Sequence, residues 1–157
     1  MKNMGRKNKK KKRSSRSRSH QHKASPHKIG SHRNRSVNKS ALKVAHALEL
    51  QKQGRPEEAE KIYDDVLKKE PNNAEALHFK GIAAYQTGRH ELAIEVIEKS
   101  ISITPGVPET YSNLSLSQYS LGRFDDAVLS AKKAIELNPS FFQAHNNLGT
   151  ILMEMGF

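Results

Sequence analysis

Two asparagines, Asn113 and Asn147, stand 34 residues apart, and each precedes a leucine, in SNLS and NNLG. A carboxamide donates and accepts hydrogen bonds at once, so side chains of this type can hold the backbone of a bound peptide whatever its sequence. Alternatively, both are ordinary solvated or helix-capping residues. The pair indicates peptide binding rather than a reaction, and its spacing directs attention to what else recurs every 34 residues.

The other residue types give little support to catalysis or to a bound cofactor. The chain has no cysteine, which excludes thiol catalysis and every cysteine-based metal site. The histidines beyond the N-terminal segment lie at unrelated points of the sequence pattern, so no shared metal geometry follows. No phosphate loop or nucleophile elbow is present. We therefore expect no metal, no cofactor and no enzymatic activity in the residues present.

Beyond residue 39 the sequence repeats every 34 residues, which predicts a repeat protein. Glycine, proline and alanine each recur at this one interval. The units are 40–73, 74–107, 108–141 and an incomplete 142–157. The residues that define the pattern are Gly54, Gly88, Gly122 and Gly156, then Pro71, Pro105 and Pro139, then Ala59, Ala93 and Ala127, and finally Gly81 and Gly149.

Each complete unit is predicted to form two amphipathic helices around a glycine turn. The turn glycine stands where the first helix must end, because only glycine adopts the left-handed conformation at low cost. Pro56 and Pro108 fit the first position of a helix, where the missing N–H is of no consequence. Small residues such as Gly81 and Ala93, on opposite helices of one pair, are expected to allow close approach. The predicted fold class is all-α, a solenoid of helix pairs.

A 34-residue helix–turn–helix unit with Gly, Ala and a terminal Pro in this order resembles the tetratricopeptide repeat (TPR) family, over residues 40–157. The resemblance implies a right-handed superhelix with a groove lined by the first helix of each unit. It also implies a protein-interaction scaffold that binds an extended peptide or a helix in that groove. The departures are mild, since Ala47 and Ser115 stand where Gly is usual and Lys43 replaces a large residue.

The resemblance assigns the groove-facing positions, which are mostly polar and include no cluster of Lys or Arg. The candidate peptide-binding residues are His78, Ile82, Tyr85, Ser112, Asn113, Leu116, Tyr119, Asn146, Asn147 and Thr150, with Glu75, Glu109 and Gln143 on the same side. The two tyrosines could instead serve in packing. Family members that clamp the C-terminal carboxylate of chaperones use Lys and Asn where this chain has Val44, Leu48 and Phe79, so that subtype is disfavoured.

The two asparagines also resemble the ladder with which O-linked N-acetylglucosamine transferases, including bacterial ones, hold a substrate's backbone. Phe79 and Ala45 interrupt the ladder upstream. The alternative function is therefore a substrate-presenting N-terminal part of a larger TPR-containing glycosyltransferase or other transferase. The incomplete unit 142–157 has the same implication, because it ends before a second helix. We expect a fragment rather than a terminal cap, and an uncapped last helix would allow oligomerisation.

The N-terminal segment 1–39 is strongly basic, with 15 Lys or Arg and no Asp or Glu, whereas the remainder has 12 basic and 16 acidic residues. It has almost nothing to bury and is predicted to be a disordered tail. It could make weak contact with nucleic acid or an acidic partner through counterion release, or act only as a solubilising arm. We see no secretory signal and no membrane span, and we expect a cytoplasmic protein.

Overall fold

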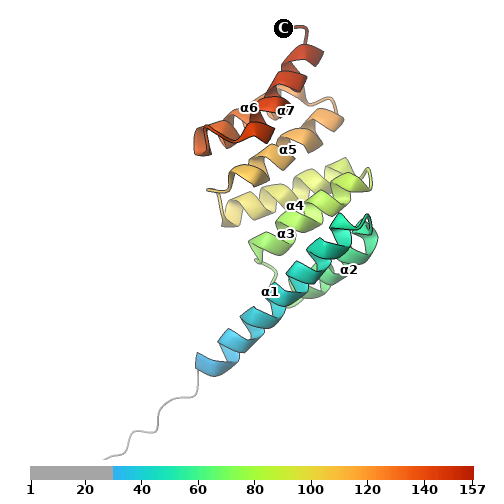
Figure 1. Cartoon of the computed structure of the whole chain (residues 1–157), viewed down its shortest axis with the longest axis vertical. Coiled ribbons are helices and arrows are strands. Elements are labelled where there is room, and N and C mark those ends of the chain that lie inside the picture. Colours follow the sequence, from blue (N-terminus) through green and yellow to red (C-terminus); the bar gives the residue numbers. More distant parts are fainter. Residues whose placement is uncertain (1–29) are drawn as a thin grey trace, which may run out of the picture.

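The computed structural model describes residues 30–157, and it describes side chains from Lys39 onward. The described chain consists of helices and turns, stacked as successive helix pairs in one elongated array (Figure 1). The helices are α1 (Gly30–Lys52), α2 (Pro56–Leu67), α3 (Ala74–Gln86), α4 (His90–Ile103), α5 (Pro108–Ser120), α6 (Phe124–Leu137) and α7 (Phe142–Glu154). The prediction of an all-α helical solenoid is confirmed.

The first helix begins earlier than the sequence pattern predicts, at Gly30 rather than near Ser40. The stretch between these residues contains neither proline nor a further glycine. A helix that is already anchored by packing extends through such a stretch at little cost, because propagation is far easier than nucleation. Residues 1–29 lie outside the described part of the chain, and so does most of the predicted disordered tail with its possible nucleic-acid contact.

The first helix of each unit ends at a glycine, as predicted. Gly54, Gly88, Gly122 and Gly156 have φ values of 77°, 75°, 70° and 86°, in the left-handed region that other residues rarely adopt. The N–H after each glycine reaches back to the last helical turn: Arg55 N–H donates to the Leu50 carbonyl at 3.0 Å. This geometry satisfies carbonyls that a helix end leaves free. The second helix of the first unit begins at Pro56, and the first helix of the third unit begins at Pro108, also as predicted.

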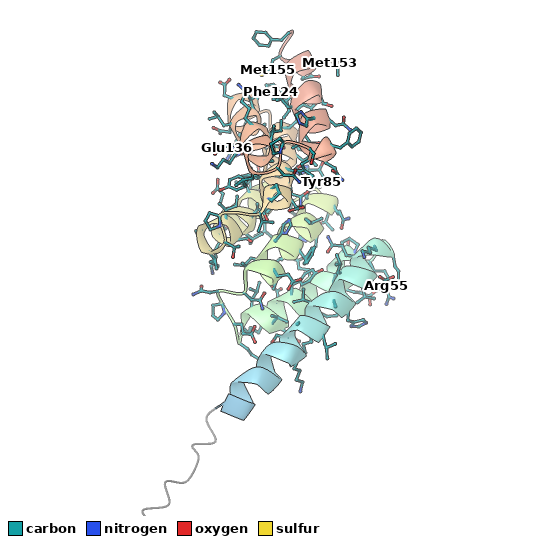
Figure 2. All side chains as sticks on the ribbon, turned by 60° about the vertical axis from the view of Figure 1, so that its left-hand side comes forward. Arg55, Tyr85, Phe124, Glu136, Met153 and Met155 are labelled. Atoms are coloured by element: carbon teal, nitrogen blue, oxygen red, sulfur yellow. The ribbon has the colours of Figure 1, made fainter. Side chains whose placement is uncertain are left out.

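The core follows the stack as a series of small apolar clusters. Tyr63 is its largest fully buried side chain, and the ring stacks on Phe79 of the next unit at a centroid distance of 6.3 Å. Nearer the C-terminus, Phe124 and Met155 pack against a cluster that contains Ile151 (Figure 2). Because each unit buries its apolar face against the neighbouring unit, the array is stable only as a stack.

Gly81 is a point of close contact between α3 and side chains of α4. A methyl group added there would overlap Cγ1 of Ile97 and would lie 3.0 Å from its Cδ1 and 3.2 Å from Cγ2 of Val96. The predicted counterpart Ala93 is fully buried, but Ile97 and Val96 are the side chains that lie on the glycine. The equivalent residue of the last unit, Gly149, has no such neighbour within 4 Å.

The last helix leaves apolar side chains exposed. Phe142 and Met153 of α7 are 68% and 70% exposed, and Met153 lies at the C-terminal end of the stack (Figure 2). The other large apolar residues of α7 are covered more fully, since Leu148 and Leu152 are half-buried and Ile151 is buried. Oligomerisation through α7 remains a prediction.

The third unit has an unusually polar interior. The buried side chains of α5 other than Leu114 are hydroxyl or amide groups: Thr110, Ser112, Ser115, Ser117 and Gln118. Facing them from α6, Ser130 donates a hydrogen bond from Oγ to Oε1 of Gln118 at 2.7 Å. Ser115 and Ser117 bond to carbonyls of their own helix, so the Gln118–Ser130 hydrogen bond and the buried alanines of α6 join the two helices.

Candidate peptide-binding groove

The contacts between helices show which side of the stack is concave. The first helices touch along the array, α1 with α3, α3 with α5, and α5 with α7. In the described residues the second helices α2, α4 and α6 make no such contacts with one another. The layer of first helices is therefore the tighter one, and the stack curves towards it. The concave side thus lies along α3, α5 and α7, the helices on which the family resemblance places the groove residues.

One pocket of this groove lies between α5 and α7. It has a volume of about 410 Å³ and contains six residues that were placed on the groove side, four of which are among the ten candidate peptide-binding residues. Its lining consists of Glu109, Ser112, Asn113, Leu116, Phe141, Gln143 and Asn147. Phe141 was not predicted to line the groove. It precedes the first residue of α7, so the helical spacing used to assign groove positions does not include it.

A second pocket, of about 310 Å³, lies between α3, the end of α4 and the start of α5. Its lining consists of Ala74, Glu75, His78, Ser100, Thr104, Val107 and Thr110. The residues from α4 and Thr110 were not predicted, since they do not face the groove by helical position alone. The two pockets meet at a hydrogen bond, in which Nδ2 of Asn113 lies 2.8 Å from Nε2 of His78.

The two asparagines hold neighbouring units together. Nδ2 of Asn147 donates to the Ser112 carbonyl at 3.1 Å and lies 2.9 Å from the Ser112 Oγ and 3.4 Å from the Ser115 Oγ. A carbonyl can only accept, so it fixes which end of the amide faces the array. The donor side of Asn147 is therefore occupied within the array, while its Oδ1 forms no hydrogen bond with other described residues.

The other predicted groove residues lie outside both pockets. The ring of Tyr85 lies 5.2 Å from that of His90, and the ring of Tyr119 lies 5.8 Å from that of Phe124, so both tyrosines pack against the second helix of their own unit. The three that remain line neither pocket: Ile82 is half-buried, and Asn146 and Thr150 are exposed. The pockets thus gather five of the ten candidates, namely His78, Ser112, Asn113, Leu116 and Asn147.

The half-buried His78 predicts a loss of stability in weakly acidic solution. Burial lowers the pKa of its imidazole from the ordinary 6.5, although Glu109 acts in the opposite direction. The unfolded chain therefore takes up this proton at a higher pH than the folded chain. The contribution of His78 to stability is complete above pH 6.5 and is lost as the pH falls from there through the folded-state pKa.

We expect the thermal unfolding midpoint to fall more steeply below pH 6.5 in the wild-type chain than in His78→Gln. The substitution His46→Gln, at an exposed histidine of α1, serves as the control and should keep the wild-type profile. Calorimetry across this pH range measures the effect. Identical profiles for wild type and His78→Gln would contradict this assignment.

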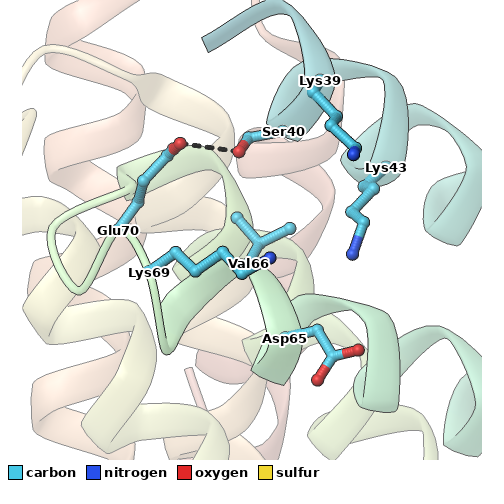
Figure 3. Close-up of a pocket in the computed structure, with 7 residues that line it drawn as sticks. All are labelled: Lys39, Ser40, Lys43, Asp65, Val66, Lys69 and Glu70. Carbon is cyan, nitrogen blue, oxygen red and sulfur yellow. Dashed lines mark hydrogen bonds between the residues drawn. The ribbon is translucent and has the colours of Figure 1, made fainter. Parts of the chain in front are cut away.

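A pocket outside the groove has three lysines in its lining, together with the carboxylates of Asp65 and Glu70. It lies between α1 and α2, with a volume of about 250 Å³, and Figure 3 shows Lys39 and Lys43 extending to the same side of α1. Lys69 completes its basic rim, and Val66 lies among the lining residues. These three lysines form no ion pair with other described residues. The pocket extends the basic character of the N-terminal sequence onto the first unit.

An acidic side chain within this pocket is fixed by neutral donors. The Ser40 hydroxyl donates to Glu70 at 2.6 Å (Figure 3), and Nδ2 of Asn73 donates to the same carboxylate at 2.9 Å. These hydrogen bonds lower the pKa of Glu70. Glu70 therefore helps to fix α1 on the end of α2.

Among the described residues, no group of three or more His, Asp or Glu side chains is placed to hold a metal ion. In the same part of the chain, no helix is long and apolar enough to cross a membrane.

Stacked helix pairs with left-handed glycine turns and a groove on the inner helix layer define a helical-repeat protein. Two family profiles identify the repeat: one described as tetratricopeptide repeat matches residues 44–108, and one described as TPR repeat matches residues 116–156. The chain belongs to the tetratricopeptide repeat family. No curated protein sequence matches it significantly.

Solved structures share this fold. The chain is similar to a mutant of the Thermobaculum terrenum O-GlcNAc transferase, with a TM-score of 0.73 and 28% identity over 75% of this chain and 23% of that one. It thus spans less than a quarter of that transferase chain. It is also similar to the first TPR of Spaghetti (RPAP3) bound to the HSP90 peptide SRMEEVD, with a TM-score of 0.72 and 19% identity over 76% and 95% of the two chains. MamA from Desulfovibrio magneticus RS-1 has a TM-score of 0.69 and 23% identity over 74% and 66%.

Proposed function

We propose that this protein is a non-catalytic interaction scaffold that binds an extended peptide or a helix of a partner protein in the groove of α3, α5 and α7. The observation that carries the proposal is the pair of adjoining pockets along the inner helix layer, joined by the contact between His78 and Asn113. The similar TPR of Spaghetti, which is bound to an HSP90 peptide, supports it as an example of the same fold with a peptide ligand.

The groove substitution Leu116→Arg tests this proposal. Leu116 lines the pocket between α5 and α7, so a long charged side chain there should fill the pocket and weaken peptide binding at least tenfold, a loss of about 1.4 kcal/mol. Random twelve-residue peptides displayed on phage are first selected on the full chain, and affinities of the selected peptides are then measured by fluorescence anisotropy.

The matched control is Leu129→Arg, because Leu129 is a 67% exposed leucine of α6 that lines neither groove pocket. It should leave peptide affinity unchanged. Unfolding midpoints of both variants show whether the fold is kept. Selected peptides that bind both variants like the wild type, or lose equal affinity to both, would count against the groove as the binding site.

A second candidate function is supported by the 28% identity to the O-GlcNAc transferase and by the two groove asparagines. In that case the array presents protein substrates to a catalytic domain of a larger protein. Sequencing of the intact gene through and beyond the codon for Phe157 tests it. A transferase domain in the same reading frame would support this candidate, and a reading frame without one would eliminate it.

A further inference from the structure

We infer that the groove selects a cationic partner: an extended protein segment with two Lys or Arg side chains two or three residues apart, one for Glu75 and one for Glu109. The inference rests on the proposed function, because it assumes that the groove binds a peptide. It adds the chemistry of the partner, which follows from the charges and the free hydrogen-bonding groups of the two pockets.

The groove pockets carry negative charge that the array itself does not neutralise. Glu75 lines the pocket beside α4 and Glu109 lines the pocket beside α7, and neither lining includes a Lys or an Arg. Both carboxylates are exposed, and neither forms an ion pair with other described residues. The one titratable base between them, His78, stays neutral at pH 7, since burial lowers its pKa. Each pocket therefore offers one unpaired carboxylate.

The uncharged groups of the groove favour hydrogen-bond donors in the ligand. The amide donors of Asn113 and Asn147 face His78 and Ser112 of the preceding units, which leaves the carbonyl oxygens for a ligand. Acceptors and carboxylates together suit backbone N–H groups and cationic side chains.

The separation of α3 and α5, whose first turns contain Glu75 and Glu109, sets the spacing of the cations. α3 and α5 contact each other directly, and packed helices have axes about 8–10 Å apart. An extended chain advances about 3.3–3.6 Å per residue, so two or three residues cover this distance. The basic pocket of Lys39, Lys43 and Lys69 lies apart from these sites, between α1 and α2. Acidic ligands are thus not drawn to the groove by its own charges.

The inference is tested with three blocked nine-residue probes of alanine and serine. One has arginine at the fourth and sixth positions, one has glutamine there, and one has glutamate. We expect the full-length chain to bind the arginine probe most tightly and the glutamate probe least, with an arginine affinity that falls as salt is added. Isothermal calorimetry at low and physiological ionic strength measures both effects.

The double variant Glu75→Gln with Glu109→Gln should weaken binding of the arginine probe about 2- to 30-fold, since each exposed ion pair contributes modestly. It should leave the affinity for the glutamine probe unchanged. The matched control, Glu91→Gln with Glu98→Gln, removes two exposed carboxylates of α4 that line neither groove pocket. Equal losses in both double variants would overturn the inference, because diffuse charge alone would then explain binding.

The outcomes separate this inference from the proposed function. Peptides that bind in the groove without preference for arginine overturn the inference and leave the scaffold proposal intact. A chain that binds neither these probes nor any displayed peptide overturns both.

Discussion

Replacement of Tyr63 by alanine is expected to lower the free energy of unfolding by about 3–5 kcal/mol, the range for large buried aromatic side chains. The side chain is fully buried and its ring stacks on Phe79, so it connects the first unit to the second. Its hydroxyl donates to Oε1 of the buried Gln51 at 3.0 Å, which links α2 to α1 as well. Tyr63→Ala therefore opens a cavity and also leaves the Gln51 side-chain amide without its hydrogen-bond partner.

Chemical denaturation of the full chain measures this effect. Two further variants separate the contribution of the ring from that of the hydroxyl. Tyr63→Phe keeps the ring but removes the donor, which should lower stability by about 1–3 kcal/mol because Gln51 remains buried and unpaired. Adding Gln51→Leu removes the unpaired amide and should restore part of that loss. If Tyr63→Ala behaved like Tyr63→Phe, the ring would not have the packing role assigned to it.

Replacement of Gly81 by leucine is expected to lower stability by about 1–3 kcal/mol through overpacking. The space above Gly81 is filled by Ile97, which is fully buried and cannot move away without disturbing its own neighbours. Even Gly81→Ala should be destabilising, although alanine is intrinsically the better helix residue. Thermal unfolding followed by circular dichroism measures both variants.

The period of the sequence supplies a matched control at Gly149. This glycine has the same place in its unit but no neighbour within 4 Å of an added methyl group. Gly149→Ala should therefore stabilise α7 by up to about 1 kcal/mol, since only helix propensity changes. Opposite signs at the two glycines are the expected result. A stabilising Gly81→Ala would show that the α3–α4 contact is looser than the structure indicates.

The repeat architecture was readable from the sequence because it depends on residues with few alternatives. A left-handed turn needs glycine, and a close helix crossing needs a small side chain, so positions such as Gly88 and Gly81 recur at a fixed interval. The beginning of α1 at Gly30 was not predicted. No residue marks it, since the mostly polar residues of 30–39 are compatible with helix and with disorder alike.

The site was only partly predictable, for a different reason. Helical position places Asn147 on the groove side, but it does not reveal that Ser112 of the neighbouring unit takes its amide donor. Likewise Tyr85 and Tyr119 have groove positions, yet each turns to an aromatic residue of the following helix. Such pairings depend on contacts between units. A repeat pattern gives each residue its place within one unit and leaves its neighbours in the next undetermined.

The hydroxyl- and amide-rich interior of the third unit has a consequence for cooperativity. In a linear array the stability of each junction depends on its own contacts, so a junction poor in apolar burial opens at a lower free energy than its neighbours. The stack then has two blocks: α1–α5, in which Leu114 joins α5 to an apolar cluster with Ile94 and Ile97 of α4, and α6–α7, which opens at a lower free energy. A ligand across both pockets contacts α3 in one block and α7 in the other. Its binding would join the two blocks into one cooperative unit, and the array would respond to its partner by stiffening along its length.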